Sequence, residues 1–191
     1  MFLFTKENAL SSDICNRFID TFEKSDLKRP GALYGSTGLD QGSSKKVSTD
    51  ISFYPEMEKD PEWGELLSNA VQCIEKGVLD YKFRFETAFS NLDSSSLAPL
   101  FNMQRYEPSE AFHGFHCERA GLKHSNRVLV WMIYLNTVTD RGETHFYYQN
   151  HYEQPVQGKL VVWPSDWTYL HRGVASPTQT KYILTGWYIH V

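Results

Sequence analysis

Residues 127–135 read Arg-Val-Leu-Val-Trp-Met-Ile-Tyr-Leu, in which one arginine is followed only by aliphatic and aromatic side chains. β-Branched and aromatic residues of this kind favour sheet. Similar short stretches, separated by Gly, Asn, Pro and Asp, occupy 100–107, 112–117, 144–148, 159–163, 168–172 and 180–190. Seven or eight short strands with no helix between them predict a jelly roll or a barrel. The mouth of such a barrel is a natural site for a ligand.

The residues before this β-rich half predict helices. Ser11 or Ser12 can cap a helix in which Ile14, Phe18 and Phe22 recur every four residues and form one buried stripe. This pattern predicts a helix with a single apolar face toward the rest of the protein.

A second helix is marked by a stronger start signal. Asp60 is a good N-cap residue and Pro61 suits the first helical position. Apolar residues from Trp63 to Val78 then recur at helical spacing, so this helix should pack on a sheet. We therefore expect one domain over 1–191, with helical support and a loop in 1–99 and the barrel in 100–191.

The segment 30–48 between the two helices contains four glycines and few apolar residues. This composition predicts a mobile loop. It is either a plain surface connection or a lid that carries Tyr34 over a binding site.

Charge and cysteine content exclude several classes of protein. The 191 residues include 19 basic and 23 acidic side chains, so the net charge of −4 argues against a nucleic-acid partner. Three cysteines without a CxxC pair are too few for a disulfide framework, which favours a reducing compartment. The only apolar stretch at the N-terminus is too short for a signal peptide or a membrane span. We expect a cytoplasmic protein that binds neither nucleic acid nor membrane.

One short motif offers ligands for a metal ion. In His116-Cys117-Glu118 the imidazole and the carboxylate are two residues apart, so on a strand they point to the same side. His171 lies in a later predicted strand and could complete a set of two histidines and one carboxylate. This set, with open coordination positions, is typical of non-haem iron(II) oxygenases. Ten residues later, Lys181 could reach the far end of a dicarboxylate that chelates the metal.

At this point the sequence resembles the 2-oxoglutarate/iron(II) dioxygenases, in particular the branch of prolyl 4-hydroxylases and their small bacterial and phage relatives. The blocks that carry the resemblance stand in the family's order at 103–108, 112–118, 130–136, 141–146, 158–165, 171–173 and 181–187. The resemblance implies a mostly β fold, the double-stranded β-helix, with the N-terminal helices packed on its outer sheet. It also implies that His116, Glu118 and His171 hold iron(II).

The same resemblance implies a site for 2-oxoglutarate. Lys181 matches the cation that binds the distal carboxylate, and Tyr134 and Tyr106 match tyrosines that form hydrogen bonds with the cofactor. Thr185 and Trp187 follow Lys181 on the same strand face and would line this pocket. The expected reaction converts 2-oxoglutarate to succinate and carbon dioxide, with ascorbate as an auxiliary reductant. It hydroxylates a prolyl residue in a peptide or protein, or a free amino acid or similar small molecule.

The sequence departs from the family pattern at the metal site and in two loops. Glu118 stands where the family usually has aspartate, and Ser109 and Arg141 stand where glycines are usual. The glutamate keeps open the alternative of a catalytically silent double-stranded β-helix that binds a metal or ligand. The retained carboxylate disfavours the halogenating subclass.

Three residues are candidates for contact with the substrate. They are Tyr34 in the glycine-rich loop, His113 at the rim, and Arg172 beside a ligand. Two related functions are disfavoured. A nucleic-acid demethylase would need paired arginines after the distal histidine, and a zinc or manganese cupin would need an HxH pair.

Overall fold

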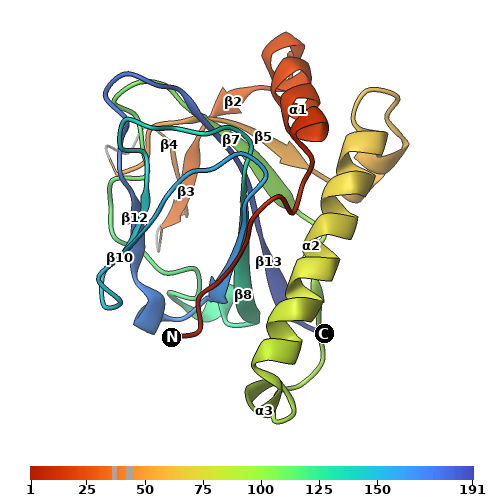
Figure 1. Cartoon of the computed structure of the whole chain (residues 1–191), viewed down its shortest axis with the longest axis vertical. Helices are drawn as coiled ribbons and strands as arrows, with labels where there is room; N and C mark the ends of the chain where they lie inside the picture. Colours follow the sequence, from red (N-terminus) through yellow and green to blue (C-terminus); the bar gives the residue numbers. More distant parts are fainter. Residues whose placement is uncertain (36–37, 42–44) are drawn as a thin grey trace.

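Two antiparallel β-sheets face each other in the computed structural model (Figure 1). The structure describes residues 1–35, 38–41 and 45–191, and it describes the side chains of all residues except 33–44. The larger sheet has the strand order β1-β11-β8-β13-β7-β5-β2, and β6 pairs with β13. Its strands are β1 (Phe4–Lys6), β2 (Arg29–Pro30), β5 (Thr49–Phe53), β6 (Ser95–Leu97), β7 (Phe101–Tyr106), β8 (Arg127–Tyr134), β11 (Leu160–Pro164) and β13 (Lys181–His190).

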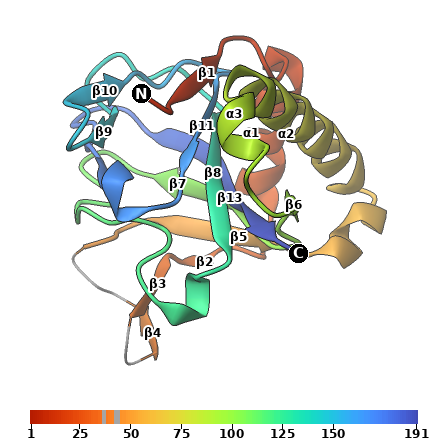
Figure 2. The same cartoon turned by 90° about the horizontal axis from the view of Figure 1, so that it is seen from below.

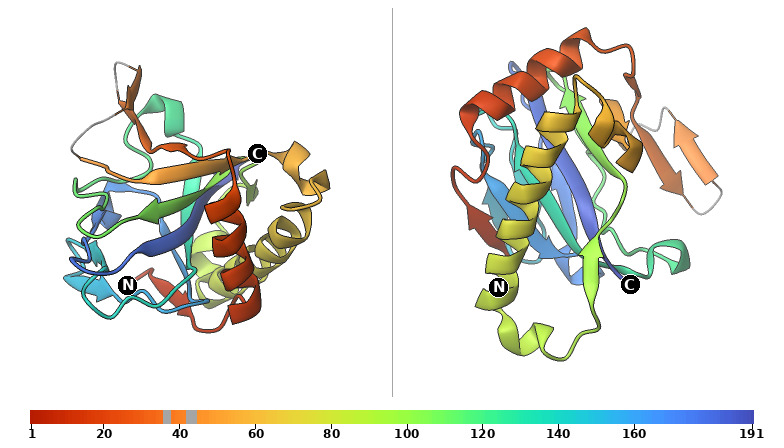
Figure 3. Two further views of the ribbon diagram at one scale, coloured as in Figure 1. Left: turned by 90° about the horizontal axis from the view of Figure 1, so that it is seen from above. Right: turned by 90° about the vertical axis from the view of Figure 1, so that its right-hand side faces the viewer.

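The smaller sheet has the order β10-β9-β12. It consists of β9 (Thr144–Phe146), β10 (His151–Glu153) and β12 (His171–Gly173). A separate hairpin of β3 (Ala32–Gly35) and β4 (Gly38–Gln41) projects from the body of the protein beside β2 (Figures 2 and 3). This arrangement of two facing sheets is the double-stranded β-helix that the resemblance implies.

The helices cover the outer face of the larger sheet (Figures 1 and 3). They are α1 (Ser12–Lys24), α2 (Gly64–Arg84) and the short α3 (Glu86–Phe89), and three 3-10 turns lie at η1 (Pro55–Lys59), η2 (Leu122–His124) and η3 (Trp167–Tyr169). None of the helices in the described part of the chain is both long and apolar enough to cross a membrane.

Side chains of β8 divide the interior into two apolar cores. Leu129, Trp131 and Ile133 point toward the helices and join the larger core with residues of α1 and α2. Val130 and Met132 point the other way, into the space between the two sheets. This alternation follows from the two-residue period of a strand, and it makes β8 buried on both faces.

The helix starts agree with the capping residues. The Ser11 hydroxyl accepts a hydrogen bond from the Ile14 backbone N–H at 3.3 Å, so Ser11 is the N-cap of α1. Asp60 accepts from the backbone N–H groups of Glu62 and Trp63 at 2.8 and 3.1 Å. Residues 61–63 form a turn, however, and α2 begins at Gly64.

The structure corrects two strand predictions, one loop prediction and the boundary between helices and barrel. The predicted loop at 30–48 contains the β3–β4 hairpin, and the strand β5 that follows it pairs with β7 in the larger sheet. The predicted strand at 112–117 is irregular and makes only isolated bridges, from Phe112 to Lys46 and from His116 to His171. The predicted strand at 168–172 is mostly the turn η3, with β12 beginning at His171. The larger sheet also includes β1, β2, β5 and β6 from the first 99 residues, so residue 99 does not separate helices from barrel.

Two loop residues adopt the backbone conformation expected of the glycines they replace. Ser109 has φ 73° and Arg141 has φ 63°. Positive φ is unfavourable for residues with a Cβ atom, which explains why glycine is usual at both positions.

Candidate active site

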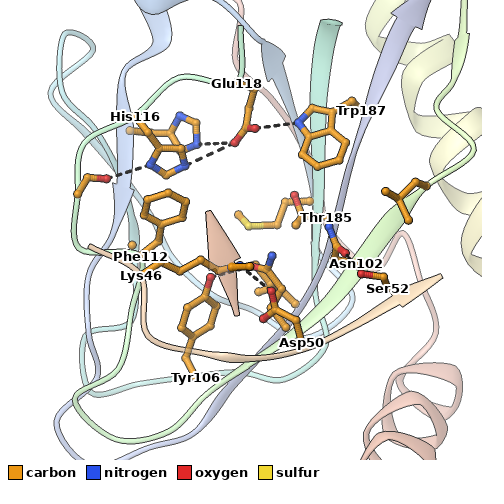
Figure 4. A pocket seen from close by; sticks show the side chains of 18 of the residues that line it. Lys46, Asp50, Ser52, Asn102, Tyr106, Phe112, His116, Glu118, Thr185 and Trp187 are labelled. Carbon is orange, nitrogen blue, oxygen red and sulfur yellow. Dashed lines mark hydrogen bonds and ion pairs between the residues drawn. The ribbon is translucent and has the colours of Figure 1, made fainter. Parts of the chain in front are cut away.

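A cavity of about 1000 Å³ opens between the two sheets and is the place where the predicted site residues meet. Its walls come from β5, β7 and β13 of the larger sheet, from β12 of the smaller sheet, and from the irregular segment that contains His116. Figure 4 shows His116 and Glu118 on one side of this cavity and the polar side chains of Asp50, Ser52 and Asn102 from β5 and β7 on the other.

The structure brings the three predicted metal ligands together. One ligand atom from each of His116, Glu118 and His171 lies within 4.8 Å of the other two. Oε1 of Glu118 lies 3.5 Å from Nε2 of His116 and 3.8 Å from Nε2 of His171. All three donors therefore face one point that a single ion could occupy.

Backbone pairing holds the two histidines side by side. His116 and His171 each donate the backbone N–H to the other's carbonyl oxygen at 2.9 Å. The backbone N–H of Glu118 donates to the carbonyl of Ser165 at 3.1 Å, immediately after β11. The ligands converge because this loop is tied to β12 and to the end of β11, and not because 112–117 forms a strand.

Hydrogen bonds and ring contacts orient each imidazole. Nδ1 of His116 lies 2.9 Å from the carbonyl of Gly114, and Nδ1 of His171 lies 2.9 Å from the carbonyl of Tyr169. A proton on each Nδ1 leaves Nε2 free as a lone-pair donor toward the site. The ring of Phe112 stacks on His116, with centroids 3.6 Å apart, and limits its rotation.

The ionisation states suit a metal ion. Burial lowers the pKa of His171 to about 3, so its imidazole is neutral at physiological pH. Burial alone would raise the pKa of Glu118, but the hydrogen bond and charge of His116, with His171 and Arg127 nearby, lower it to about 2. Neutral imidazoles and an ionised carboxylate are the forms that bind metals, and this donor set fits iron(II).

The second oxygen of Glu118 has its own partners. Oε2 accepts a hydrogen bond from Nη1 of Arg127 at 3.1 Å and from Nε1 of Trp187 at 2.9 Å (Figure 4). Trp187 was predicted to line the cofactor pocket, and it lines the cavity. The contact of Arg127 with Glu118 was not predicted, and no local sequence signal connects these two residues.

Lys181 begins β13 and points into the same cavity. Its side chain is buried, and Nζ donates to the carbonyl of Gly142 at 2.9 Å and lies 5.2 Å from the ring centroid of Tyr106. Among the described residues no carboxylate forms an ion pair with it. Burial lowers the pKa of Lys181 to about 8. This buried cation is suited to bind an anion that enters the cavity.

The other predicted cofactor residues lie either on the wall of the cavity that holds Lys181 or behind this wall. Tyr106 and Thr185 line the cavity, and their hydroxyls donate to Oε1 of Gln104 at 2.7 Å and to the carbonyl of Trp131 at 3.1 Å. Tyr134 lies behind this wall. Its hydroxyl is 2.7 Å from Oγ1 of Thr144, which does line the cavity, and it donates to the carbonyl of Glu153 at 3.3 Å.

Of the three predicted substrate residues, His113 and Arg172 do not line the cavity. His113 is exposed and does not line the cavity. The guanidinium of Arg172 lies 4.7 Å from the ring centroid of Phe115, which is at the cavity mouth. The side chain of Tyr34 lies outside the described residues.

Sequence reasoning missed the polar wall opposite the metal site. Nζ of Lys46 pairs with Oδ2 of Asp50 at 2.6 Å, and Ser52 donates to Oδ1 of Asn102 at 2.8 Å (Figure 4). Asp50 and Ser52 alternate with the buried Ile51 on β5. This two-residue period was the signal that could have revealed both the strand and its polar face.

Comparisons with known proteins agree with this geometry. Residues 101–189 match the 2OG-Fe(II) oxygenase superfamily. No curated protein sequence matches the chain.

Solved structures with the same fold include three prolyl hydroxylases. The viral collagen prolyl hydroxylase of Paramecium bursaria Chlorella virus-1, in its 2OG complex, is 18% identical with a TM-score of 0.68, covering 100% of this chain and 97% of that one. The Pseudomonas putida prolyl-4-hydroxylase is 18% identical with a TM-score of 0.72, covering 98% and 92%. A Trichoplax adhaerens prolyl hydroxylase in complex with a hypoxia inducible factor peptide is 15% identical with a TM-score of 0.75, covering 98% and 83%.

The superfamily match contains all three metal-ligand candidates and Lys181, and the fold of these neighbours is the predicted double-stranded β-helix. The predicted double-stranded β-helix is therefore confirmed, and the superfamily match agrees with the predicted family. Residues 101–189 are similar to the 2OG-Fe(II) oxygenase superfamily, whose cofactors are iron(II) and 2-oxoglutarate, and the chain shares its fold with the solved prolyl hydroxylases.

Proposed function

We propose that the protein hydroxylates a prolyl residue in a peptide or protein, with succinate and carbon dioxide as co-products. One oxygen atom of dioxygen enters succinate and the other enters the new hydroxyl group. The observation that carries the proposal is the buried Lys181, which forms no ion pair with any described carboxylate and lies in the same cavity as His116, Glu118 and His171. The pair of sites matches a dicarboxylate that binds the metal at one end and a cation at the other.

Each residue of this site has a defined task. His116 and His171 would hold iron(II) through Nε2, and Glu118 through Oε1. Iron(II) held by these residues would supply dioxygen activation, coupled to decarboxylation of 2-oxoglutarate and oxidation of the substrate. Lys181 would bind the distal carboxylate in a dry environment, where a charge-assisted hydrogen bond is strong. Thr185 and Tyr106 would close the wall beside it.

Aromatic side chains at the cavity mouth support a peptide substrate. Phe115 lines the mouth and is 37% exposed, and the ring of Tyr147 meets it edge-on at 5.1 Å. Tyr148 continues this exposed surface, with its ring 5.2 Å from that of Tyr147. Exposed aromatic grooves are a common means of docking proline-rich chains in the polyproline II conformation. The structural neighbours include a collagen prolyl hydroxylase and an enzyme bound to a peptide, which agrees with this choice.

A free amino acid is the second candidate substrate, and the polar wall favours it. Lys46 and Asp50 lie on the cavity wall with opposite charges. Such a pair could receive the carboxylate and the ammonium group of one small zwitterion.

A cytoplasmic location is also part of the proposal, supported by the free thiols of Cys15, Cys73 and Cys117.

The test compares substrates under identical conditions with iron(II), 2-oxoglutarate, ascorbate and air. The substrates are a proline-rich peptide, the same peptide with alanine in place of each proline, and free proline. We expect succinate release and the gain of one oxygen atom in the proline-rich peptide alone, measured by mass spectrometry. His171→Ala should abolish both signals because it removes a metal ligand.

Other outcomes lead to different functions. Oxidation of free proline without oxidation of the peptide would support the amino-acid substrate. Absence of succinate with every substrate, in a protein that binds both metal and 2-oxoglutarate, would favour the catalytically silent alternative.

A further inference from the structure

Glu118 has more freedom than an aspartate at the same position. Its additional methylene adds a rotatable bond, and the carboxylate could turn one or both oxygens toward a metal ion. A ligand that alternates between one and two oxygens changes the number of positions left for other ligands. The protein therefore needs a means of fixing this carboxylate.

Arg127 holds Glu118 at two points with one nitrogen. Its Nη1 donates to the backbone carbonyl of Glu118 at 3.1 Å and to Oε2 of the same residue at 3.1 Å. The indole Nε1 of Trp187 donates to Oε2 from another direction at 2.9 Å. Oε2 thus receives two donors, whereas Oε1 is the oxygen that faces both histidines.

The two donors are themselves fixed. The guanidinium of Arg127 lies 3.6 Å from the ring centroid of Trp187, a cation–π contact. They come from the paired strands β8 and β13, in which Trp187 is opposite Val130. Both side chains of the ion pair are 17% exposed, so solvent competes little for the carboxylate.

We infer that Arg127 and Trp187 are positioning residues that occupy Oε2 of Glu118 and restrict it to one metal-binding oxygen. The pair compensates for the longer side chain in a motif that usually carries aspartate. An aspartate would end one methylene closer to the backbone and could not reach the histidines and both donors together. The inference concerns the metal site alone and is independent of whether the substrate is a prolyl peptide.

The test measures cobalt(II) binding to the full chain, so that it needs no turnover. Trp187→Phe removes the indole N–H and keeps an aromatic ring beside Arg127, and Arg127→Gln removes the guanidinium. Trp131→Phe is the matched control, because its indole N–H is buried on the opposite face of the larger sheet and has no hydrogen-bond partner among the described residues. Calorimetry gives the affinity, and the visible spectrum of bound cobalt(II) loses intensity as its coordination number rises.

We expect Trp187→Phe and Arg127→Gln each to weaken cobalt(II) binding by about tenfold, as is common for groups that hold a metal ligand. The cobalt spectrum should lose intensity as Oε2 joins the metal. Trp131→Phe should change neither signal. In the Glu118→Asp background, Trp187→Phe should cause no further loss of cobalt(II) affinity, because the shorter carboxylate no longer accepts the hydrogen bond of the indole.

The inference is overturned if Trp187→Phe keeps the parent affinity and spectrum. It is also overturned if Trp131→Phe weakens cobalt(II) binding equally. The same holds if Trp187→Phe weakens cobalt(II) binding as much in the Glu118→Asp variant as in the parent protein. Circular dichroism of the metal-free variants checks folding. If Arg127→Gln does not fold, Trp187→Phe alone decides, since it removes only one donor and part of a ring.

Discussion

Two lysines of the barrel are equally buried but have opposite surroundings. Lys159 and Lys181 are each 5% exposed. Nζ of Lys159 lies 2.7 Å from Oε1 of Glu153 and 3.1 Å from Oε1 of Glu7. Nζ of Lys181 donates to a backbone carbonyl at 2.9 Å and, within the described part of the chain, pairs with no carboxylate.

The ionisation of the two lysines differs accordingly. Burial opposes the charge of Lys159, but its hydrogen bonds to Glu153 and Glu7 raise its pKa above the ordinary value. Burial dominates at Lys181 and lowers its pKa. A buried charge without a partner is unfavourable, and it persists where a ligand supplies the opposite charge. The comparison therefore separates a structural cation from one that we propose binds 2-oxoglutarate.

The largest expected effect comes from breaking the structural pair. Lys159→Met leaves Oε1 of the buried Glu153 carboxylate without its cation and only Oε2 paired, with His151, and we expect the free energy of unfolding to fall by about 3 kcal/mol. Urea denaturation measures this change. The control is Lys6→Met, which breaks a partly exposed pair with Asp80 and should cost only about 0.2–1 kcal/mol. A loss at Lys159 no larger than this control would contradict the structural role.

Lys181→Met should show the opposite pattern. It removes a buried cation that forms no ion pair with any described carboxylate, so the free energy of unfolding should stay the same or rise. The affinity for 2-oxoglutarate should fall by about 100-fold, as for loss of one partner of a buried charge pair. Calorimetry with manganese(II) in place of iron measures binding without turnover. A variant that loses stability as Lys159→Met does, while binding 2-oxoglutarate normally, would make the two lysines equivalent.

Lys181 was predictable because its strand and its spacing are both visible in the sequence. The apolar stretch that follows it marks β13, and the family blocks align it ten residues after His171. Strand β5 was less visible. Only Ile51 and Phe53 are apolar and buried in it, because its other face, with Asp50 and Ser52, points to the cavity.

The direction of side chains in the irregular segment was not predictable. The argument from strand alternation placed His116 and Glu118 on one side, and they do converge, but through backbone bonds to His171 and Ser165. The contact between Glu118 and Trp187 joins residues 69 positions apart. It depends on the strand order β11-β8-β13, because Glu118 is tied to Ser165 at the end of β11 and Trp187 lies on β13.

The pH dependence of binding sharpens the comparison further. Lys181 in the free protein has a pKa lowered to about 8, and the carboxylate of 2-oxoglutarate favours its protonated form. Binding above pH 8 therefore requires uptake of a proton. The dissociation constant should be constant below this pH and rise up to about tenfold per pH unit above it.

Lys181→Arg is the control for this profile. Arginine remains charged throughout the range, so the dissociation constant should no longer rise above pH 8. The same rise in Lys181→Arg would assign the pH dependence to another group.

The smallest expected effect concerns Tyr134, whose hydroxyl lies between the two lysine sites. It donates to the carbonyl of Glu153, the residue that pairs with Lys159, and it also meets Thr144 on the wall of the cavity that holds Lys181. We predict that this hydroxyl turns toward the distal carboxylate of bound 2-oxoglutarate. Tyr134→Phe should then weaken 2-oxoglutarate binding by about fivefold, the equivalent of one hydrogen bond of about 1 kcal/mol. If 2-oxoglutarate binding stays unchanged and the free energy of unfolding falls, Tyr134 has a structural role like that of Lys159 and Glu153.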